Sequence, residues 1–433
     1  MSSFSTYGPS HDMYLKPAIS APGGAILSTV PIELGSWGIK SGTSMATPFA
    51  AGSYALLLQV KGKNADTAKD ARTLFQNTAI PIKQALTNDS LIETASHQGA
   101  GLINVYDAIK NPGSLTPSEL LLNDTANFKG VHTLLVKNDG KKSVTYTLTH
   151  VPAGTANTIN GIEPILGPVP LINNAAVVTI VPNKIIVPAG RSAPFIVSIK
   201  APAGLDATKL PVYSGYIKAT GSDNTTLQST YMGLAASLKD AKIVDNTEAY
   251  FGVKLPVVTD GQGNPVPPTG SANYTMNGTD TPLVLYRLVQ GSPLVQFDLI
   301  DSKTYVTNNQ RRSSGIELAE RSDIPTGPYS TLSKRSIWDW LFPTKGQTYG
   351  GSFAAVKTLG VLYQEDYVPR NSAAPTADSN GYSGLQVLTF ANGTAIPDGS
   401  YKVLFRALKI TGNPRSQGDY EVWTSPMVVI KRT

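Results

Sequence analysis

The sequence contains no cysteine, few histidines and little charge. Of its 433 residues none is cysteine, four are histidine and 15% are charged. The lack of cysteine excludes disulfide bonds, thiol catalysis and cysteine-ligated metal sites, but it does not decide the compartment. No apolar run approaches the length of a membrane-spanning helix, so we predict no membrane span. Net charge is +6, yet no cluster of basic residues alternates with aromatic ones, so we predict no nucleic-acid partner.

The composition indicates a β-rich protein of several domains. The chain is 41% hydrophobic, with 39 glycines and 31 prolines. Its length exceeds that of one ordinary domain, and two to three domains are expected. Residues 1–4 are not followed by the basic and apolar regions of a signal peptide, so we expect no signal peptide in this chain.

One stretch combines small residues, a serine and an apolar helical pattern. Residues 41–44 read Ser-Gly-Thr-Ser, and the apolar run behind them ends near Gly62. In the first turn of a helix, free N–H groups and the helix dipole favour negative charge close to Ser44. A nucleophilic serine needs that environment, and Gly42 has no side chain to block a peptide substrate. Pro48 is predicted to lie in the first turn, because proline disrupts a helix interior.

Four motifs make the chain resemble the subtilisin-like serine proteases, the subtilase family. The serine motif Gly-Thr-Ser-Met-Ala-x-Pro occupies residues 42–48, and the other matches, in family order, are residues 4–9, 16–23 and 98–104. The resemblance implies an α/β fold and serine endopeptidase activity on protein or peptide substrates. It identifies Ser44 as the catalytic nucleophile and places Gly42 and Thr43 along the substrate cleft.

The other catalytic groups of the family are not recognisable. The family order is aspartate, histidine, then serine, and the residues before Ser44 contain only His11 and Asp12, neither in the family context. The remaining histidines follow the serine and are interpreted as surface or satisfied side chains: His97, His132 and His150. No match to the oxyanion asparagine is present. We therefore expect the chain to begin after most of the active site and to be inactive alone.

One position departs from the family pattern. Ala18 stands where the family usually has aspartate, which removes a carboxylate that could hydrogen-bond its loop or help hold a cation. The resemblance allows calcium, but acidic residues are scattered and no metal constellation stands out. We predict no cofactor and no metal ligands.

Residues 1–113 are predicted to be the C-terminal part of the α/β peptidase domain. They include a strand at residues 25–30, the serine helix and a second helix at 66–78. The serine helix is apolar on nearly every side and should be buried all round, but this segment holds too little sheet to cover it. We expect residues 1–113 alone to be poorly stable or aggregation-prone.

Two antiparallel β-sandwich domains are predicted to follow. Residues 115–239 resemble a fibronectin type III-like domain, with a hairpin turn at 138–140 between two strands. Residues 240–433 are predicted to form the second sandwich, with a long loop at 304–328. The aromatic cluster at 338–342 is either a ligand-binding surface or, as we prefer, a hydrophobic plug between domains. The predicted strands are residues 132–136, 144–149, 177–181, 195–199, 213–217, 294–300, 385–390, 401–407 and 427–430.

The leading hypothesis is the C-terminal portion of a secreted or cell-wall-associated subtilisin-like endopeptidase. Its partners would be protein substrates and the missing N-terminal half of the peptidase domain. The alternative is a noncatalytic binding or structural β-protein that carries a degenerate peptidase remnant. The reading frame immediately upstream would discriminate between the two.

Overall fold

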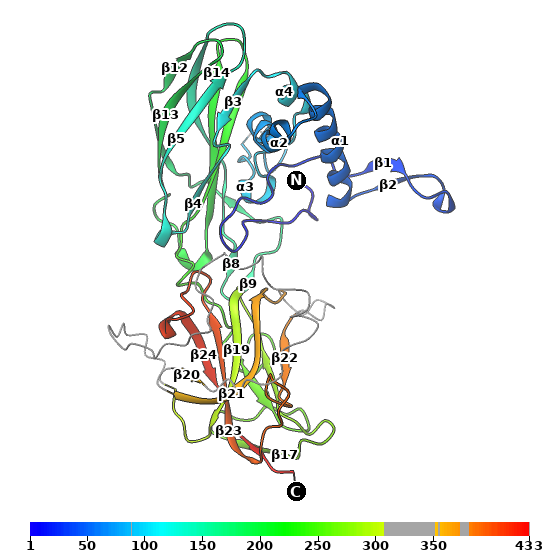
Figure 1. Cartoon of the computed structure of the whole chain (residues 1–433), viewed down its shortest axis with the longest axis vertical. Helices are drawn as coiled ribbons and strands as arrows, with labels where there is room; N and C mark the ends of the chain where they lie inside the picture. Colours follow the sequence, from blue (N-terminus) through cyan, green and yellow to red (C-terminus); the bar gives the residue numbers. More distant parts are fainter. Residues whose placement is uncertain (88, 307–350, 354–355, 373–380, 433) are drawn as a thin grey trace. The chain divides into compact units, whose positions relative to one another are not determined.

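The computed structural model describes residues 1–87, 89–306, 351–353, 356–372 and 381–432. By their internal contacts these residues divide into two compact units, Met1–Ala241 and Lys242–Thr433, coloured along the chain in Figure 1. The aromatic cluster at 338–342 and most of the predicted loop at 304–328 lie outside the described residues.

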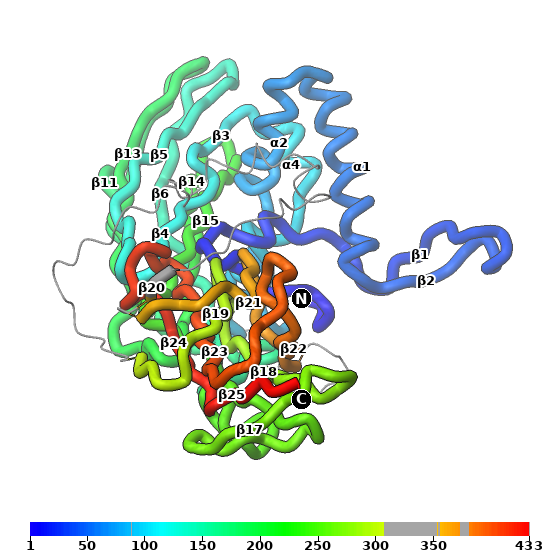
Figure 2. Tube along the Cα trace, turned by 60° about the horizontal axis from the view of Figure 1, so that its bottom comes forward, coloured from blue at the N-terminus to red at the C-terminus, as the bar shows by residue number. Residues whose placement is uncertain are grey.

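The first part of unit 1 is a small helical body with one projecting hairpin. Its elements are β1 (Ile26–Thr29), η1 (Ile32–Leu34), β2 (Trp37–Lys40), α1 (Thr43–Lys61), α2 (Ala65–Thr78), α3 (Ala95–Gln98) and α4 (Val105–Lys110). Strands β1 and β2 pair antiparallel and extend away from the helices in both Figure 1 and Figure 2. The predicted strand and both predicted helices are therefore present.

Local signals in the sequence explain where the helices begin and end. Helix α1 stops at Gly62, whose φ of 117° suits glycine and whose N–H donates to Leu58 O at 3.1 Å. Helix α2 starts after Asn64, whose side chain accepts from Thr67 N at 2.9 Å. The prediction for Pro48 is wrong in one respect: it is the sixth residue of α1 and not part of the first turn.

Helix α1 is only partly covered. Its Leu57 joins a small core with residues of α2 and α4: Ala71, Phe75 and Ala108. Phe49, Leu56 and Val60 on the same helix are exposed, Val60 by 62%. The prediction that this segment cannot bury its serine helix is confirmed, because the described residues place no sheet over that face.

The second part of unit 1 is a β-sandwich. Its strands are β3 (Gly113–Thr116), β4 (Glu119–Asn123), β5 (Val131–Asn138), β6 (Val144–Pro152), β7 (Thr155–Ala156), β8 (Ile159–Asn160), β9 (Glu163–Pro164), β10 (Leu171–Ile172), β11 (Val177–Val181), β12 (Lys184–Val187), β13 (Arg191–Lys200), β14 (Val212–Gly221) and β15 (Thr226–Leu234). One sheet has the order β11-β13-β5-β3. The other has the order β10-β7-β14-β15-β4, with β6 on β14 and β12 on β6. Alternate residues such as Leu134, Val136, Phe195 and Val197 form the core between the sheets.

The predicted hairpin at residues 138–140 is wrong. Strand β5 pairs with β3 and β13, whereas β6 pairs with β12 and β14 in the other sheet. The connection crosses between sheets because buried Asn138 anchors it. Its side chain bonds Lys142 O, Val187 O and Gly140 N at 2.8–3.0 Å. Sequence alternation alone did not distinguish this corner from a hairpin turn.

A buried polar interface joins the helical body to the sandwich. Asn77, at the end of α2, donates to Leu115 O and Gln228 O and accepts from Leu115 N, each at 2.9 Å. The Gln228 side chain in turn donates to Ala100 O at 2.6 Å. On the same side, α2 lies against β3 and β15. The sandwich thus orients α2, against which α1 packs.

Unit 2 is a second β-rich unit. Its strands are β16 (Val257–Thr259), β17 (Ser271–Tyr274), β18 (Leu283–Tyr286), β19 (Ser292–Asp301), β20 (Gly351–Phe353), β21 (Val356–Val368), β22 (Ser383–Gln386), β23 (Gly399–Leu408), β24 (Tyr420–Thr424) and β25 (Met427–Ile430). Sheets of order β16-β18-β22 and β17-β25-β23-β19-β21-β20 enclose a core with Phe297, Phe405 and Tyr286. The predicted strand at 385–390 is placed too late, because β22 covers residues 383–386 and the Phe390 N–H bonds Thr394 O in a turn beyond it.

Candidate functional site

Ser44 is the second residue of α1 and is exposed. The N–H groups of Met45 and Ala46 donate to Gly42 O at 3.0 and 3.4 Å, which fixes the first turn. Within the described residues neither the hydroxyl nor the N–H of Ser44 has a hydrogen-bond partner. Both groups are therefore available to a ligand, at a helix end that favours negative charge.

The approach to Ser44 is held by short backbone contacts. The Gly42 N–H donates to Gly23 O at 2.8 Å, and the Ala25 N–H donates to the Ser41 hydroxyl at 2.8 Å. A Cβ on Gly23 would lie 2.8 Å from Gly42 O, so a side chain there would push the two segments apart. The turn before the serine is consequently closely packed although its surface is open.

Pro48 has a local effect on the serine turn. In an α-helix the N–H of residue 48 would donate to the carbonyl of residue 44. Proline has no N–H, so the Ser44 carbonyl receives no helical hydrogen bond from that position. The Thr47 hydroxyl donates to Thr43 O at 3.0 Å, so it reinforces the neighbouring carbonyl and leaves that of Ser44 without a helical donor.

The three histidines after the serine contact residues other than Ser44. His132 bonds Lys129 O at 2.8 Å, and His150 bonds the Tyr231 hydroxyl at 2.9 Å. His97 is 2% exposed, stacks on Tyr7 and has Nδ1 3.4 Å from Glu93 Oε2. Neither ring nitrogen of His97 makes a hydrogen bond within the described residues, so it is buried and only partly satisfied. None of these three side chains serves Ser44 as a base in this structure.

The backbone conformation explains why the motif at residues 98–104 contains two glycines. Gly99 has φ 63° and Gly101 has φ 118°, conformations that favour glycine. A Cβ on Gly99 would lie 2.5 Å from Pro17 O. The motif thereby brings residues 98–103 against residues 17–20, where Ser20 N donates to Gly101 O at 2.8 Å.

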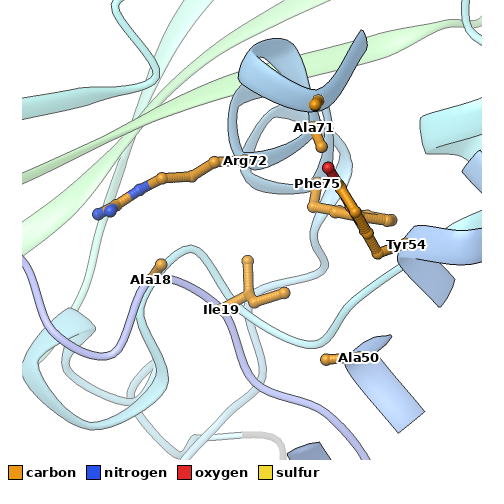
Figure 3. Close-up of a pocket in the computed structure, with 8 residues that line it drawn as sticks. Ala18, Ile19, Ala50, Tyr54, Ala71, Arg72 and Phe75 are labelled. Carbon is orange, nitrogen blue, oxygen red and sulfur yellow. The ribbon is translucent and has the colours of Figure 1, made fainter. Parts of the chain in front are cut away.

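An apolar pocket lies between α1, α2 and the loop at residues 18–19 (Figure 3). It has a volume of about 290 Å³ and is lined by residues of α1, α2 and the preceding loop: Ala18, Ile19, Ala50, Tyr54, Ala68, Ala71, Arg72 and Phe75. Arg72, which lines this pocket, pairs with Glu119 of β4 at 2.8 Å. The pocket carries no group suited to peptide hydrolysis.

The described residues contain neither a metal-binding cluster nor a membrane-spanning helix. No three His, Cys, Asp or Glu side chains gather closely enough in that part of the chain to hold a metal ion. Among its helices, none combines the length and the apolar character that crossing a bilayer requires.

No local pattern marks the residues that hold the helical body in place. Asn77 ends an amphipathic helix and Gln228 lies within a strand, so both resembled ordinary surface positions. Gln98 was part of a recognised motif, yet its side-chain bonds to Ile82 N and Glu93 O were not foreseen. Such contacts join segments that are distant in sequence and follow no periodic pattern.

Comparisons with known proteins divide the first unit into two matches. Residues 1–103 match the model of the subtilase family, and residues 120–232 match that of an Fn3-like domain. The PI-type proteinase of Lactococcus lactis subsp. cremoris is 31% identical over 57% of this chain and 14% of its own length. The minor extracellular protease Vpr of Bacillus subtilis is 27% identical over 55% of this chain and 32% of its own.

A shorter relative matches the first segment alone. Thermitase of Thermoactinomyces vulgaris is 37% identical over 25% of this chain and 32% of its own length. This chain thus spans about a third or less of these relatives.

Proposed function

Because residues 1–103 belong to the subtilase family and residues 120–232 form an Fn3-like domain, we propose that this chain is the C-terminal portion of a secreted subtilisin-like serine endopeptidase. Ser44 is its nucleophile, and Gly42 and Thr43 line the substrate cleft. The observation that carries the proposal is the exposed Ser44 hydroxyl in the first turn of α1, directly after Gly42. The extracellular assignment rests on relatives such as the minor extracellular protease.

The chemistry would be acyl transfer. Ser44 Oγ attacks the scissile carbonyl, and the Ser44 N–H at the helix end helps to bind the oxyanion. A histidine takes the serine proton and an aspartate orients that histidine, and both belong to polypeptide outside residues 1–433. In subtilisin, removal of the histidine alone lowers kcat by roughly 10⁶-fold, so this chain by itself would be inactive.

The uncovered face of α1 supports the proposal that the rest of the peptidase domain is a partner of this chain. Exposed Phe49, Leu56 and Val60 form an apolar stripe, and Trp37 and Ile39 on the neighbouring hairpin are exposed as well, Trp37 by 65%. Soluble monomers rarely expose contiguous apolar surface of this kind. We propose that the remaining part of the peptidase domain covers it.

The domain boundaries belong to the proposal too. Residues 1–113 would be peptidase segment, 115–239 the fibronectin type III-like sandwich and 240–433 the second sandwich. The hydrogen bonds of Asn77 and Gln228 support a bracing role for the first sandwich.

A fluorophosphonate probe tests the proposal. The 433-residue chain should show no labelling above that of its Ser44→Ala variant. A fusion that places the Asp- and His-bearing half of thermitase before residue 1 should be labelled, and Ser44→Ala should abolish that labelling. Efficient labelling of Ser44 in the bare chain would contradict the requirement for outside residues. Sequencing upstream of the gene gives an independent check.

Ala18 favours the second candidate, a noncatalytic β-protein with a degenerate peptidase remnant. The family usually has a carboxylate at this position, and alanine removes it. A stop codon or unrelated sequence immediately upstream would support this candidate.

A further inference from the structure

We infer that β11 is a self-association edge at which two copies of this chain pair antiparallel. Strand β11 is the end strand of the β11-β13-β5-β3 sheet. It pairs with β13 on one side over Val177–Val181, and its other edge pairs with no strand in the described part of the chain. That edge presents backbone donors and acceptors to solvent.

Within its five residues the edge carries no charge, proline or bulge that would block a further strand, and Pro182 directly after it limits pairing to this length. Natural edge strands carry lysine, proline or a bulge that blocks a further strand. Residues 177–181 read Val-Val-Thr-Ile-Val, with no charge and no proline, and their register with β13 runs without a shift. The strand is therefore regular and can accept another one.

The strand is also complementary to itself. If a two-fold axis passes beside Thr179, Val177 lies opposite Val181 of the second copy and Val178 lies opposite Ile180. β-Branched residues in opposite positions stabilise antiparallel pairs. Val178 and Ile180 pack against the sandwich core, so pairing would continue the cores of the two copies.

The outer face of the same edge is apolar as well. Val177 and Val181 are 64% and 59% exposed, and β13 places the half-exposed Ile196 beside Val181. In the paired sheet Val181 of one copy would meet Val177 of the other, so both lose exposed apolar surface. This burial adds to the backbone hydrogen bonds.

Charge opposes this pairing only weakly. The nearest lysine on the outer face is Lys200, which is beside Val177. The two Lys200 side chains would be separated by three strand spacings and four residues along the strands, about 20 Å. That exceeds the Debye length of about 8 Å at physiological ionic strength, so these two lysines repel each other only weakly.

The position of β11 in its sheet determines which surfaces stay free in the dimer, and the length of β11 limits how strong the dimer is. In its sheet β11 is at the opposite end from β3, the strand that contacts α2, so pairing leaves the serine helix free. A five-residue strand from each copy buries less than the roughly 1,200 Å² of a stable interface. The dimer is consequently weak and depends on concentration.

Single cysteines test the register, because the native chain has none. The full 433-residue chain with Thr179→Cys should be cross-linked to a dimer by a short bis-maleimide. A mixture of Val177→Cys and Val181→Cys chains should cross-link more than either chain alone. Thr133→Cys is the matched control, since Thr133 is exposed on the same face but belongs to β5, inside the sheet.

Sedimentation equilibrium provides the second measurement. Thr179→Lys places two lysines opposite each other at the axis, and the dimer dissociation constant should rise at least tenfold. Thr133→Lys should leave it unchanged. A chain that is monomeric at every concentration overturns the inference. A dimer whose dissociation constant is unchanged by Thr179→Lys also overturns the inference, because that dimer must form through another surface such as the exposed face of α1.

Discussion

Replacing Asn77 by alanine should destabilise unit 1 more than the loss of one side chain suggests. Asn77 is 1% exposed and satisfies three backbone groups of the sandwich: Leu115 N–H, Leu115 C=O and Gln228 C=O. Alanine would leave these groups buried without that partner. A buried polar group that loses its partner costs about 1–3 kcal/mol.

The three costs do not add fully, because water or small shifts can recover part of them. We therefore expect a loss of about 3–5 kcal/mol for Asn77→Ala. A folded domain is stable by only about 5–15 kcal/mol, so the variant should be close to unfolding at physiological temperature.

Urea unfolding followed by hydrogen exchange of the backbone amides in α2 and in β15 measures this loss. The protection of both elements should fall together, because Asn77 joins the helical body to the sandwich. Asn183→Ala is the control, since Asn183 is exposed and its side chain makes no hydrogen bond in the described residues. A loss below about 1 kcal/mol, equal to that of the control, would refute the reasoning.

Changes at His150, at Gly99 and in the length of the chain test other parts of the structure. Burial lowers the pKa of His150, so the unfolded state binds its proton more readily and stability falls as the pH drops through about 6.5. His150→Gln should lose less stability than the parent between pH 7 and pH 5 in urea titrations, and an unchanged pH dependence would exclude this contribution. Gly99→Ala should lower the unfolding temperature by several degrees, because the position has positive φ and no room for Cβ; an unchanged midpoint in scanning calorimetry would contradict the backbone reading. A polypeptide of residues 1–113 should bind an apolar dye and unfold without cooperativity, because it lacks both a cover for α1 and the partners of Asn77. A sharp transition with no dye binding would count against that.

The sequence alone determined the features that depend on local chemistry. The serine motif, the end of α1 at Gly62, the start of α2 near Asn64 and the alternating strands were all predictable. Each follows from residues that are close together in the chain, such as glycine at a left-handed position or side chains that alternate along a strand. The resemblance of residues 1–103 to the subtilase family came from such short motifs as well.

Only the tertiary structure decided how these pieces meet. It assigned β5 and β6 to different sheets and placed Pro48 in the second turn of α1. It also paired Asn77 with Gln228, which is 151 residues away in sequence. Each outcome depends on which distant backbone groups lose water together and must find partners in the protein, and no local pattern encodes that choice.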